Sequence, residues 1–503
     1  MKRGSEREQW NSQIGFILAA IGSAIGLGNI WRFSYMVYEN GGGAFLIPYL
    51  VALFTVGIPL LILEFAMGHE RMGSAPLACH KIRSNWEWLG WWAVTFVMFG
   101  IGLYYTVIIS WCLNYLILSF NLAWGQNPNQ FFFKKFLCVS SGPGVIGQIR
   151  TPIFMGLVIV WFLNWIISYR GIKKGLELAN KIFMPILFVF TAILVAWAVT
   201  LKGAMTGIRA YLTPDFSKLV NPKVWVDAFS QIFFTLSLGF GIMITYASYL
   251  PAKTNITKNA FITAIINCGY SIFSGFAVFS VLGFMATSQH QPLSKVISQS
   301  IGLAFVAYPK AISLMPGGEI FGVIFFFCLF VAGISSSISM VETFSAAIID
   351  KFGFNRKAVV STICIMGFIG STVFTTQAGL FWLDILDHFI THYGLVVVGI
   401  FECILVGWLF KLDIMRKHIN RISSIKLGAW WNGLIRYFIP LTLGIILAGD
   451  IYVELSKPYG GYSWVSIIMI GRDWVTLTLI AGLWISSRPW KTDNHNTPGR
   501  SDY

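Results

Sequence analysis

Glycines and small polar residues interrupt two stretches of this sequence that are otherwise strongly apolar. The first contains Gly22-Ser-Ala-Ile-Gly26-Leu-Gly28-Asn29, and the second contains Thr235-Leu-Ser-Leu-Gly239-Phe-Gly241. Glycine weakens a helix, and non-helical backbone inside a membrane survives only where it lines a cavity or other protein. Such backbone can offer amide groups to an anion and carbonyl oxygens to a cation. Both stretches are therefore candidate binding segments, although Gly22-x3-Gly26 alone is also typical of close helix packing.

Amide and hydroxyl side chains lie in two further apolar stretches. Asn267 and Ser271 are four residues apart, so they share one face of a helix. The run Ser335-Ser336-Ser337 follows Ala332-Gly333. Side chains of these types often form hydrogen bonds between membrane helices, but their oxygens also suit a hard cation such as sodium.

No aspartate or glutamate lies within these four polar segments. An uncompensated charge inside a membrane is costly, so a bound cation needs a negative charge from another source. The carboxylate of a bound substrate could supply one, and a second anion could also be required.

The composition places these segments in a membrane protein. Only 11% of the 503 residues are charged and 56% are hydrophobic, whereas soluble domains contain roughly 25% charged residues. The net charge of +15 could indicate nucleic-acid binding, but 24 of the 36 Lys and Arg residues fall in alternate loops and in the two tails. This asymmetry marks the cytoplasmic side. We therefore expect both termini to be cytoplasmic and no nucleic-acid partner.

Twelve apolar runs are long enough to cross a lipid bilayer. They lie at 13–34, 43–67, 88–120, 153–169, 179–200, 225–250, 258–286, 319–349, 358–375, 380–410, 434–453 and 465–487. Because the glycine-rich breaks fall in the first and sixth of the first ten, the pattern predicts two inverted repeats of five helices. The expectation is an all-α integral membrane protein of one domain, 1–503. It has a tail at 1–12, repeats at 13–200 and 225–410, two further helices at 434–487 and a tail at 488–503.

Other constellations carry little chemistry. The seven cysteines are scattered, and most of them lie inside apolar stretches of the sequence. This pattern is typical of cysteines that act as small buried hydrophobic residues. Asp384-x3-His388-x3-His392 has a spacing that can bind zinc, but it lies at an outer span end and a metal is not favoured. No nucleophile, base or dinucleotide motif has supporting context, so we expect neither an enzyme nor an organic cofactor. Short tails without outer glycosylation sites favour a prokaryotic plasma (inner) membrane.

Six motifs between about residues 7 and 410 carry a family resemblance. They are Arg7-Glu-Gln-Trp10, Gly26-Leu-Gly-Asn-Ile-Trp-Arg-Phe33, Glu39-Asn-Gly-Gly-Gly-Ala-Phe45, Gln231-Ile-Phe-Phe-Thr-Leu-Ser-Leu-Gly-Phe-Gly241, Tyr246-Ala-Ser-Tyr249 and Ala332-Gly-Ile-Ser-Ser336. They resemble the neurotransmitter:sodium symporter family, which includes the bacterial leucine transporter. The resemblance implies the leucine-transporter-like fold, with helices 1 and 6 broken.

The resemblance also implies three binding sites. The first sodium site comprises Ala24, Asn29, Thr235 and Asn267; the second comprises Gly22, Ile25, Ala332, Ser335 and Ser336. The amino-acid site comprises Ser23, Ala24, Leu27, Gly28, Ile101, Tyr105, Phe234, Thr235, Ser237, Phe240, Ser336 and Met340. Monoamine carriers of the family place aspartate at position 26, where this chain has Gly26, so the expected substrate is a zwitterionic amino acid with a neutral, mainly hydrophobic side chain.

A chloride site and two gates complete what the resemblance implies. Many bacterial relatives carry glutamate at position 271, whereas animal members carry serine and bind chloride nearby. This chain has Ser271, with Tyr49, Gln231, Thr235 and Asn267 completing the implied chloride site. The outer gate is Arg32 with Asp387, the inner gate is Arg7 with Asp350, and Glu64 is expected to brace the unwound sixth span.

The expected function is sodium-coupled import of neutral amino acids by alternating access, stimulated by chloride. The alternatives are a sensor that binds sodium and an amino acid but transports little, and a carrier driven by protons or potassium. The expected partners are the amino acid and the lipid bilayer. The sequence leaves the oligomeric state open.

Overall fold

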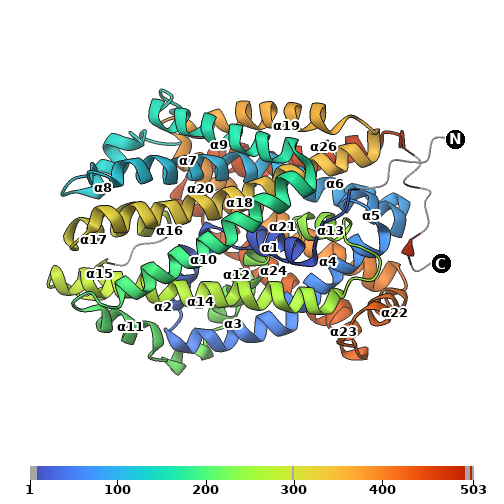
Figure 1. Ribbon diagram of the computed structural model, residues 1–503, viewed down its shortest axis with the longest axis horizontal. Coiled ribbons are helices and arrows are strands. Elements are labelled where there is room, and N and C mark those ends of the chain that lie inside the picture. Colours follow the sequence, from blue (N-terminus) through green and yellow to red (C-terminus); the bar gives the residue numbers. More distant parts are fainter. Residues whose placement is uncertain (1–7, 297–299, 493–494, 496–498, 501–503) are drawn as a thin grey trace.

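The computed structural model describes residues 8–296, 300–492, 495 and 499–500, and within them the chain is helical without a β-sheet (Figure 1). The longer helices are α1 (Gln13–Ala24), α2 (Trp31–Glu39), α3 (Leu46–Ala52), α4 (Ile58–Arg71), α5 (Ala75–Ile82), α6 (Glu87–Phe96), α7 (Gly102–Ser119), α9 (Thr151–Tyr169), α10 (Leu178–Ala198), α11 (Ala204–Leu212), α12 (Pro222–Thr235), α13 (Ile242–Ala247), α14 (Ile256–Ser288), α17 (Tyr308–Leu314), α18 (Gly318–Phe352), α19 (Arg356–Ser371), α20 (Gly379–Phe389), α21 (Leu395–Ile404), α22 (Leu412–Ile422), α24 (Ile439–Ser456) and α26 (Asp473–Ser486). The expected all-α fold is confirmed.

Short helical pieces continue or connect these helices. The α-helical pieces are α8 (Pro128–Gln130), α15 (Leu293–Val296), α16 (Ser300–Gly302), α23 (Ala429–Gly433) and α25 (Trp464–Ser466). The π-helical turns are Leu53–Gly57, Val97–Ile101, Phe131–Phe136, Ile172–Glu177, Leu303–Ala307, Ile390–Gly394, Leu405–Leu409, Leu434–Phe438 and Ile467–Arg472. The 3₁₀ turns are Leu27–Asn29, Gly43–Phe45, Ser84–Trp86, Phe216–Val220, Thr372–Thr375 and Tyr459–Gly461.

Among the described residues, ten helical stretches are long and apolar enough to cross a membrane. Each of the ten coincides with one of the twelve expected spans. The first expected span is a pair of helices, Gln13–Ala24 and Leu27–Glu39, that meet at an angle of 70°. The sixth is divided into α12 and α13, which are both too short to span alone. The full count of twelve and the inverted repeat remain predictions.

The helix α18 lies near the middle of the bundle, between α7 and α10 (Figure 1). The helix α1 packs against α10, α14 and α18, so the first break is enclosed by protein. Enclosure matters because the breaks expose polar backbone that lipid cannot satisfy.

The first break lies between α1 and α2. The backbone is extended at Ile25 and Gly26, and a single 3₁₀ turn leads into α2. The freed amides find partners inside the protein: Gly26 N donates to Asn29 Oδ1 (2.9 Å), and Leu27 N donates to Tyr105 Oη (3.2 Å). The sequence-based expectation of a broken first span is therefore confirmed.

The second break lies between α12 and α13, at residues 236–241. Ser237, Gly239 and Gly241 have φ angles of +53°, +76° and +70°, a left-handed conformation that glycine adopts most easily. Gly239 N donates to Glu64 Oε1 at 2.8 Å, and Glu64 is fully buried. The expected contact between Glu64 and the sixth span is confirmed.

Both ends of the described chain reach the same end of the bundle. Trp10 N donates to Tyr249 O (3.1 Å), and Arg500 donates through Nη2 to Leu250 O (2.8 Å). Figure 1 shows α5 and α22 at this end and α8 at the opposite end. The loop that follows α8 contains Cys138, which is half-buried, whereas the other six cysteines are buried.

Replacing Glu64 with alanine should destabilise the protein, because Gly239 N would lose its acceptor, and an unpaired buried donor costs about 1–3 kcal/mol. Glu64→Gln keeps an oxygen acceptor and should lose less. Thermal unfolding of the purified protein in detergent measures the effect. The control is Glu319→Ala, which removes an exposed carboxylate from the first turn of α18. Equal melting of Glu64→Ala and the wild type would contradict the assigned role.

A membrane-impermeant maleimide should label intact cells at Cys138 alone if the α8 end faces outward. The Cys138→Ser variant should then remain unlabelled, which identifies the thiol. Labelling that appears only after the membrane is permeabilised would invert the expected orientation.

Candidate ion and substrate sites

Four polar side chains meet beside the two breaks. They come from the 3₁₀ turn before α2 (Asn29), the last residue of α12 (Thr235) and the middle of α14 (Asn267 and Ser271). Asn29 Nδ2 lies 3.0 Å from Thr235 Oγ1 and 2.9 Å from both Asn267 Oδ1 and Ser271 Oγ. Asn267 Nδ2 donates to Thr235 Oγ1 at 3.1 Å. Three residues expected at the first sodium site thus lie together, and the chain places Ala24 at the end of α1.

Two serines of α18 face the carbonyl end of α1. Ser335 Oγ donates to Gly22 O at 2.7 Å and lies 3.0 Å from Ala332 O. Ser336 Oγ lies 3.3 Å from Ile25 O and 3.2 Å from Ala332 O. All five residues expected at the second sodium site are therefore neighbours. The last carbonyls of a helix carry partial negative charge, and here they lie together with two hydroxyl oxygens.

The residues expected to contact substrate are buried or half-buried around the same breaks. A Cβ atom on Gly26 would lie 2.8 Å from Tyr105 Oη and 3.4 Å from Ser336 Oγ. The chain is therefore closely packed at position 26, and a larger side chain there would displace Tyr105.

The other expected substrate residues form the surroundings of Tyr105 and Gly26. Phe234 and Phe240 have ring centroids 6.2 Å apart, and a Cβ on Gly28 would lie 3.5 Å from the Phe234 ring. On α18, Met340 lies near Gly102, which follows Ile101. Ser237 Oγ lies 3.4 Å from Ser23 O. The remaining expected residues, Ala24, Leu27, Thr235 and Ser336, lie on α1, in the adjoining 3₁₀ turn, on α12 and on α18.

Two fully buried polar side chains next to the Asn267 cluster have no hydrogen-bond partner among the described residues. They are Tyr49 Oη on α3 and both amide atoms of Gln231 on α12. Tyr49 lies beside Ser271, and Gln231 is one helical turn before Thr235. Buried donors are normally paired, so two unpaired ones beside Ser271 fit the recognition of an anion.

The expected outer gate has a different arrangement from a direct ion pair. Arg32 lies over the Phe234 ring, with Cζ 4.8 Å from the ring centroid. Asp387 accepts a hydrogen bond from Tyr104. Arg32 and Asp387, both within the described residues, form no ion pair with each other. Tyr104 directly precedes the expected substrate residue Tyr105. Nothing in the sequence indicated that Tyr104 would contact Asp387.

At the inner end, Arg7 lies outside the described residues, so its pairing with Asp350 stays a prediction. Asp350 Oδ2 accepts from Ser74 N at 2.8 Å, and Trp10 Nε1 donates to Tyr246 O at 2.8 Å. A cavity of about 780 Å³ opens here. Its lining includes one acidic residue, Glu8, and four basic residues, Arg170, Lys173, Lys174 and Arg500. Burial lowers the pKa of Arg500 to about 10, which still leaves it charged at neutral pH.

A buried ion pair near this end was not expected from the sequence. Glu342 is fully buried, forms an ion pair with Arg356 and accepts a hydrogen bond from Tyr249 Oη at 2.8 Å. Glu342 is seven residues after Ser335, so the 3.6-residue helical period places both on one face of α18. The spacing therefore indicates that Glu342 faces the same side as Ser335, but it does not indicate the pairing with Arg356.

The two histidines with the zinc-like spacing, His388 and His392, each contact a carboxylate on α24. His388 Nε2 lies 2.9 Å from Glu454 Oε2, and His392 Nδ1 lies 2.9 Å from Asp450 Oδ2. Asp384 accepts hydrogen bonds from Tyr459 and Tyr462. Across the described residues, no group of three or more His, Cys, Asp or Glu side chains is arranged to hold a metal ion.

Comparison with known proteins gives the family. The model of the sodium:neurotransmitter symporter family matches residues 7–130 and 125–486. An uncharacterized sodium-dependent transporter of Methanocaldococcus jannaschii is 52% identical, covering 92% of this chain and 94% of that protein. A sodium- and chloride-dependent creatine transporter of Mus musculus is 32% identical, covering 89% and 78%. A sodium- and chloride-dependent glycine transporter of Xenopus laevis is 31% identical, covering 82% and 72%. The chain therefore belongs to the sodium:neurotransmitter symporter family, whose members are multi-pass membrane transporters and not enzymes.

Proposed function

We propose that this protein imports neutral, mainly hydrophobic amino acids together with sodium by alternating access. The observation that carries the proposal is the break in the first span, where Ser335 and Ser336 of α18 lie against the carbonyls of Gly22 and Ile25. Carbonyl and hydroxyl oxygens are ligands that a hard cation prefers. A cation there would join two elements from distant parts of the chain, and so would favour one global arrangement over another.

The substrate class follows from charge and packing at the first break. Position 26 is a glycine, and a Cβ atom added to it would lie 2.8 Å from the Tyr105 hydroxyl, so the chain supplies no carboxylate for an amine at this position. The substrate must therefore carry its own carboxylate. Creatine and glycine, which appear in the names of two relatives, each have a carboxylate. Phe234, Phe240 and Met340 make an apolar surround. A single methylene changes selectivity by only about 1–3 kcal/mol, so several amino acids should be accepted.

Chloride stimulation is part of the same proposal. Tyr49 and Gln231 present buried, unpaired donors beside Ser271, and a negative charge among them would offset sodium at the neighbouring Asn267 cluster. Both vertebrate relatives are named as chloride-dependent. A chloride ion bound there would lie close to Asn267, one of the proposed cation ligands, and would supply a negative charge that the chain itself does not supply there.

Import would be driven by the sodium gradient and the membrane potential, which contributes about 2.3 kcal/mol per charge per 100 mV. Arg32 with Asp387 and Arg7 with Asp350 would alternate between closed and open states. We place the protein in a prokaryotic plasma membrane with both termini in the cytoplasm, in keeping with its similarity to an archaeal transporter.

Purified protein in sealed liposomes should accumulate labelled neutral amino acids under an inward sodium gradient. Accumulation should require sodium and should fall when gluconate replaces chloride. Large apolar amino acids should compete better than charged ones. Sodium-dependent binding without accumulation, in vesicles shown to be sealed, would contradict transport.

Replacing Ser335 with alanine should raise the sodium concentration for half-maximal uptake by about tenfold. This change corresponds to about 1.4 kcal/mol, near the usual contribution of a hydrogen bond to a charged group. The matched control is Ser337→Ala. Ser337 is on the same helix, but its hydroxyl donates to Asn164 Oδ1 at 2.8 Å, so sodium dependence should not change. An equal shift in both variants would argue against a sodium site at Ser335.

Replacing Ser271 with glutamate should make uptake independent of chloride, because the side chain supplies the missing negative charge. In the Ser271→Gln variant the new side chain is nearly the same size as glutamate but carries no charge. Uptake by this variant should therefore not become independent of chloride. Uptake measured in chloride and in gluconate distinguishes the two variants. If Gln and Glu have the same effect, side-chain volume and not charge explains the result.

A further inference from the structure

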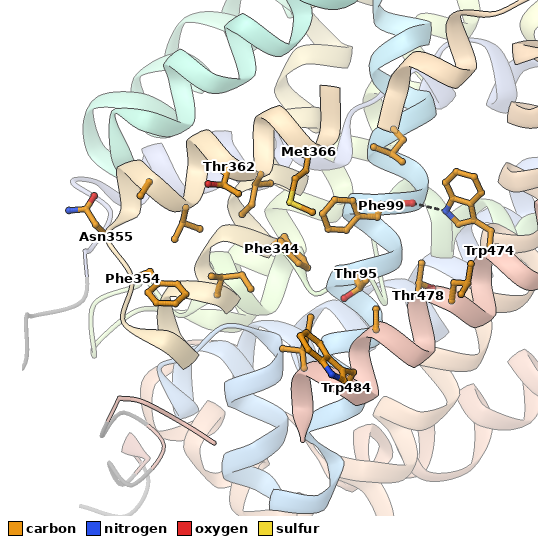
Figure 2. Close-up of a pocket in the computed structure, with 18 residues that line it drawn as sticks. Thr95, Phe99, Phe344, Phe354, Asn355, Thr362, Met366, Trp474, Thr478 and Trp484 are labelled. Carbon is orange, nitrogen blue, oxygen red and sulfur yellow. Dashed lines mark hydrogen bonds between the residues drawn. The ribbon is translucent and has the colours of Figure 1, made fainter. Parts of the chain in front are cut away.

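A long apolar groove lies on the side of the bundle, away from the ion and substrate sites. It has a cavity volume of about 860 Å³ and lies between α18, α19, α26 and the junction of α6 with α7. Figure 2 shows Phe99, Phe344, Met366 and Trp474 among the side chains that line it. The walls are almost entirely apolar, so the groove suits a hydrocarbon and not a sugar or an ion.

The groove has the depth of one membrane leaflet. Its lining extends along α26 from Trp474 to Trp484, and the ten helical steps between these two residues correspond to roughly 15 Å. The hydrocarbon core of a bilayer is about 30 Å thick. At the Trp474 end, the indole Nε1 donates to Phe99 O at 2.8 Å and joins α26 to the α6–α7 junction (Figure 2).

The groove opens toward the surroundings of the protein. Met366 on α19 is 51% exposed, and Leu477 on α26 is 63% exposed. Both line the groove. In a membrane, the molecules that reach these side chains are lipids.

Two cations lie at the other end of the groove, on aromatic residues that line it. Arg488 has its Cζ 4.4 Å from the centroid of the Trp484 ring, and Lys491 has its Nζ 5.7 Å from the Phe354 ring. Both cations are exposed, and neither pairs with a carboxylate of the described residues. Lys491 N donates to Lys351 O at 2.9 Å, which fixes this segment against the end of α18. An anionic group at this end would therefore meet two exposed positive charges.

We propose that the groove binds the hydrocarbon chain of an anionic phospholipid whose phosphate lies at Arg488 and Lys491. Basic residues at a membrane surface attract anionic lipids, and the apolar length matches one leaflet. A second copy of this chain fits less well. In a two-fold dimer through this face, the same surface meets itself, so both pairs of cations would be brought together at one membrane surface.

Native mass spectrometry of the full-length protein can test the proposal. Detergent-purified protein would be titrated with phosphatidylglycerol or with phosphatidylcholine of identical chains. We expect one phosphatidylglycerol molecule to be retained at about tenfold lower concentration than phosphatidylcholine. The double variant Arg488→Gln/Lys491→Gln should abolish this preference. The matched control is Lys253→Gln/Lys258→Gln, which removes two exposed lysines around the start of α14 and should keep the preference.

A variant that fills the groove tests the hydrocarbon part separately. Ala358 is an exposed lining residue on α19, so Ala358→Trp should fold and should weaken the retention of both lipids. Glycerol phosphate, which lacks the chain, should not compete. Retention unaffected by Ala358→Trp, or full competition by glycerol phosphate, would overturn the proposal. A dimer that Ala358→Trp dissociates would identify a second copy as the occupant instead.

Discussion

The central physical constraint on this protein is that polar backbone freed inside the membrane must find partners within the protein. Two spans are broken, and each break leaves amides and carbonyls that a continuous helix would have paired. Asn29 accepts from the Gly26 amide, Glu64 accepts from the Gly239 amide, and Ser335 donates to the Gly22 carbonyl. Each partner comes from a different part of the chain or reaches back across the break. The bundle around α18 is thus organised to enclose these contacts.

The same contacts make the breaks suitable for ions. A serine hydroxyl that donates to a carbonyl holds its own oxygen beside that carbonyl, so a pair of this kind has two oxygens in place for a cation. Ser335 donates to Gly22 O, and the Ser336 hydroxyl lies within 3.3 Å of the carbonyl oxygens of Ser23, Ile25 and Ala332. The polar groups that stabilise the broken backbone are therefore also the candidate ligands.

Charge is distributed differently at the centre and at the ends of the bundle. The centre collects neutral oxygens and the unpaired donors of Tyr49 and Gln231, whereas two carboxylates elsewhere are held by specific partners: the buried Glu342 by Arg356 and the half-buried Asp387 by Tyr104. Cations gather at the inner end, around the cavity of about 780 Å³ and at the end of the apolar groove near Arg488 and Lys491. The residues of the two candidate sodium sites include no carboxylate, so a negative charge there would have to come from what binds.

The sequence by itself determined the membrane character, the helical fold and the positions of both breaks. Apolar length fixes which segments can cross a bilayer, and glycines within such a segment, at Gly26 and at Gly239 and Gly241, mark where a helix is weakest. The family motifs also indicated that Asn29, Thr235, Asn267 and Ser271 belong together. Only the tertiary structure decided the pairing of Glu342 with Arg356, the stacking of Arg32 on Phe234 and the apolar groove closed by Trp474. These depend on how helices far apart in the sequence pack and on which way their side chains turn, and a linear pattern of residue types carries neither.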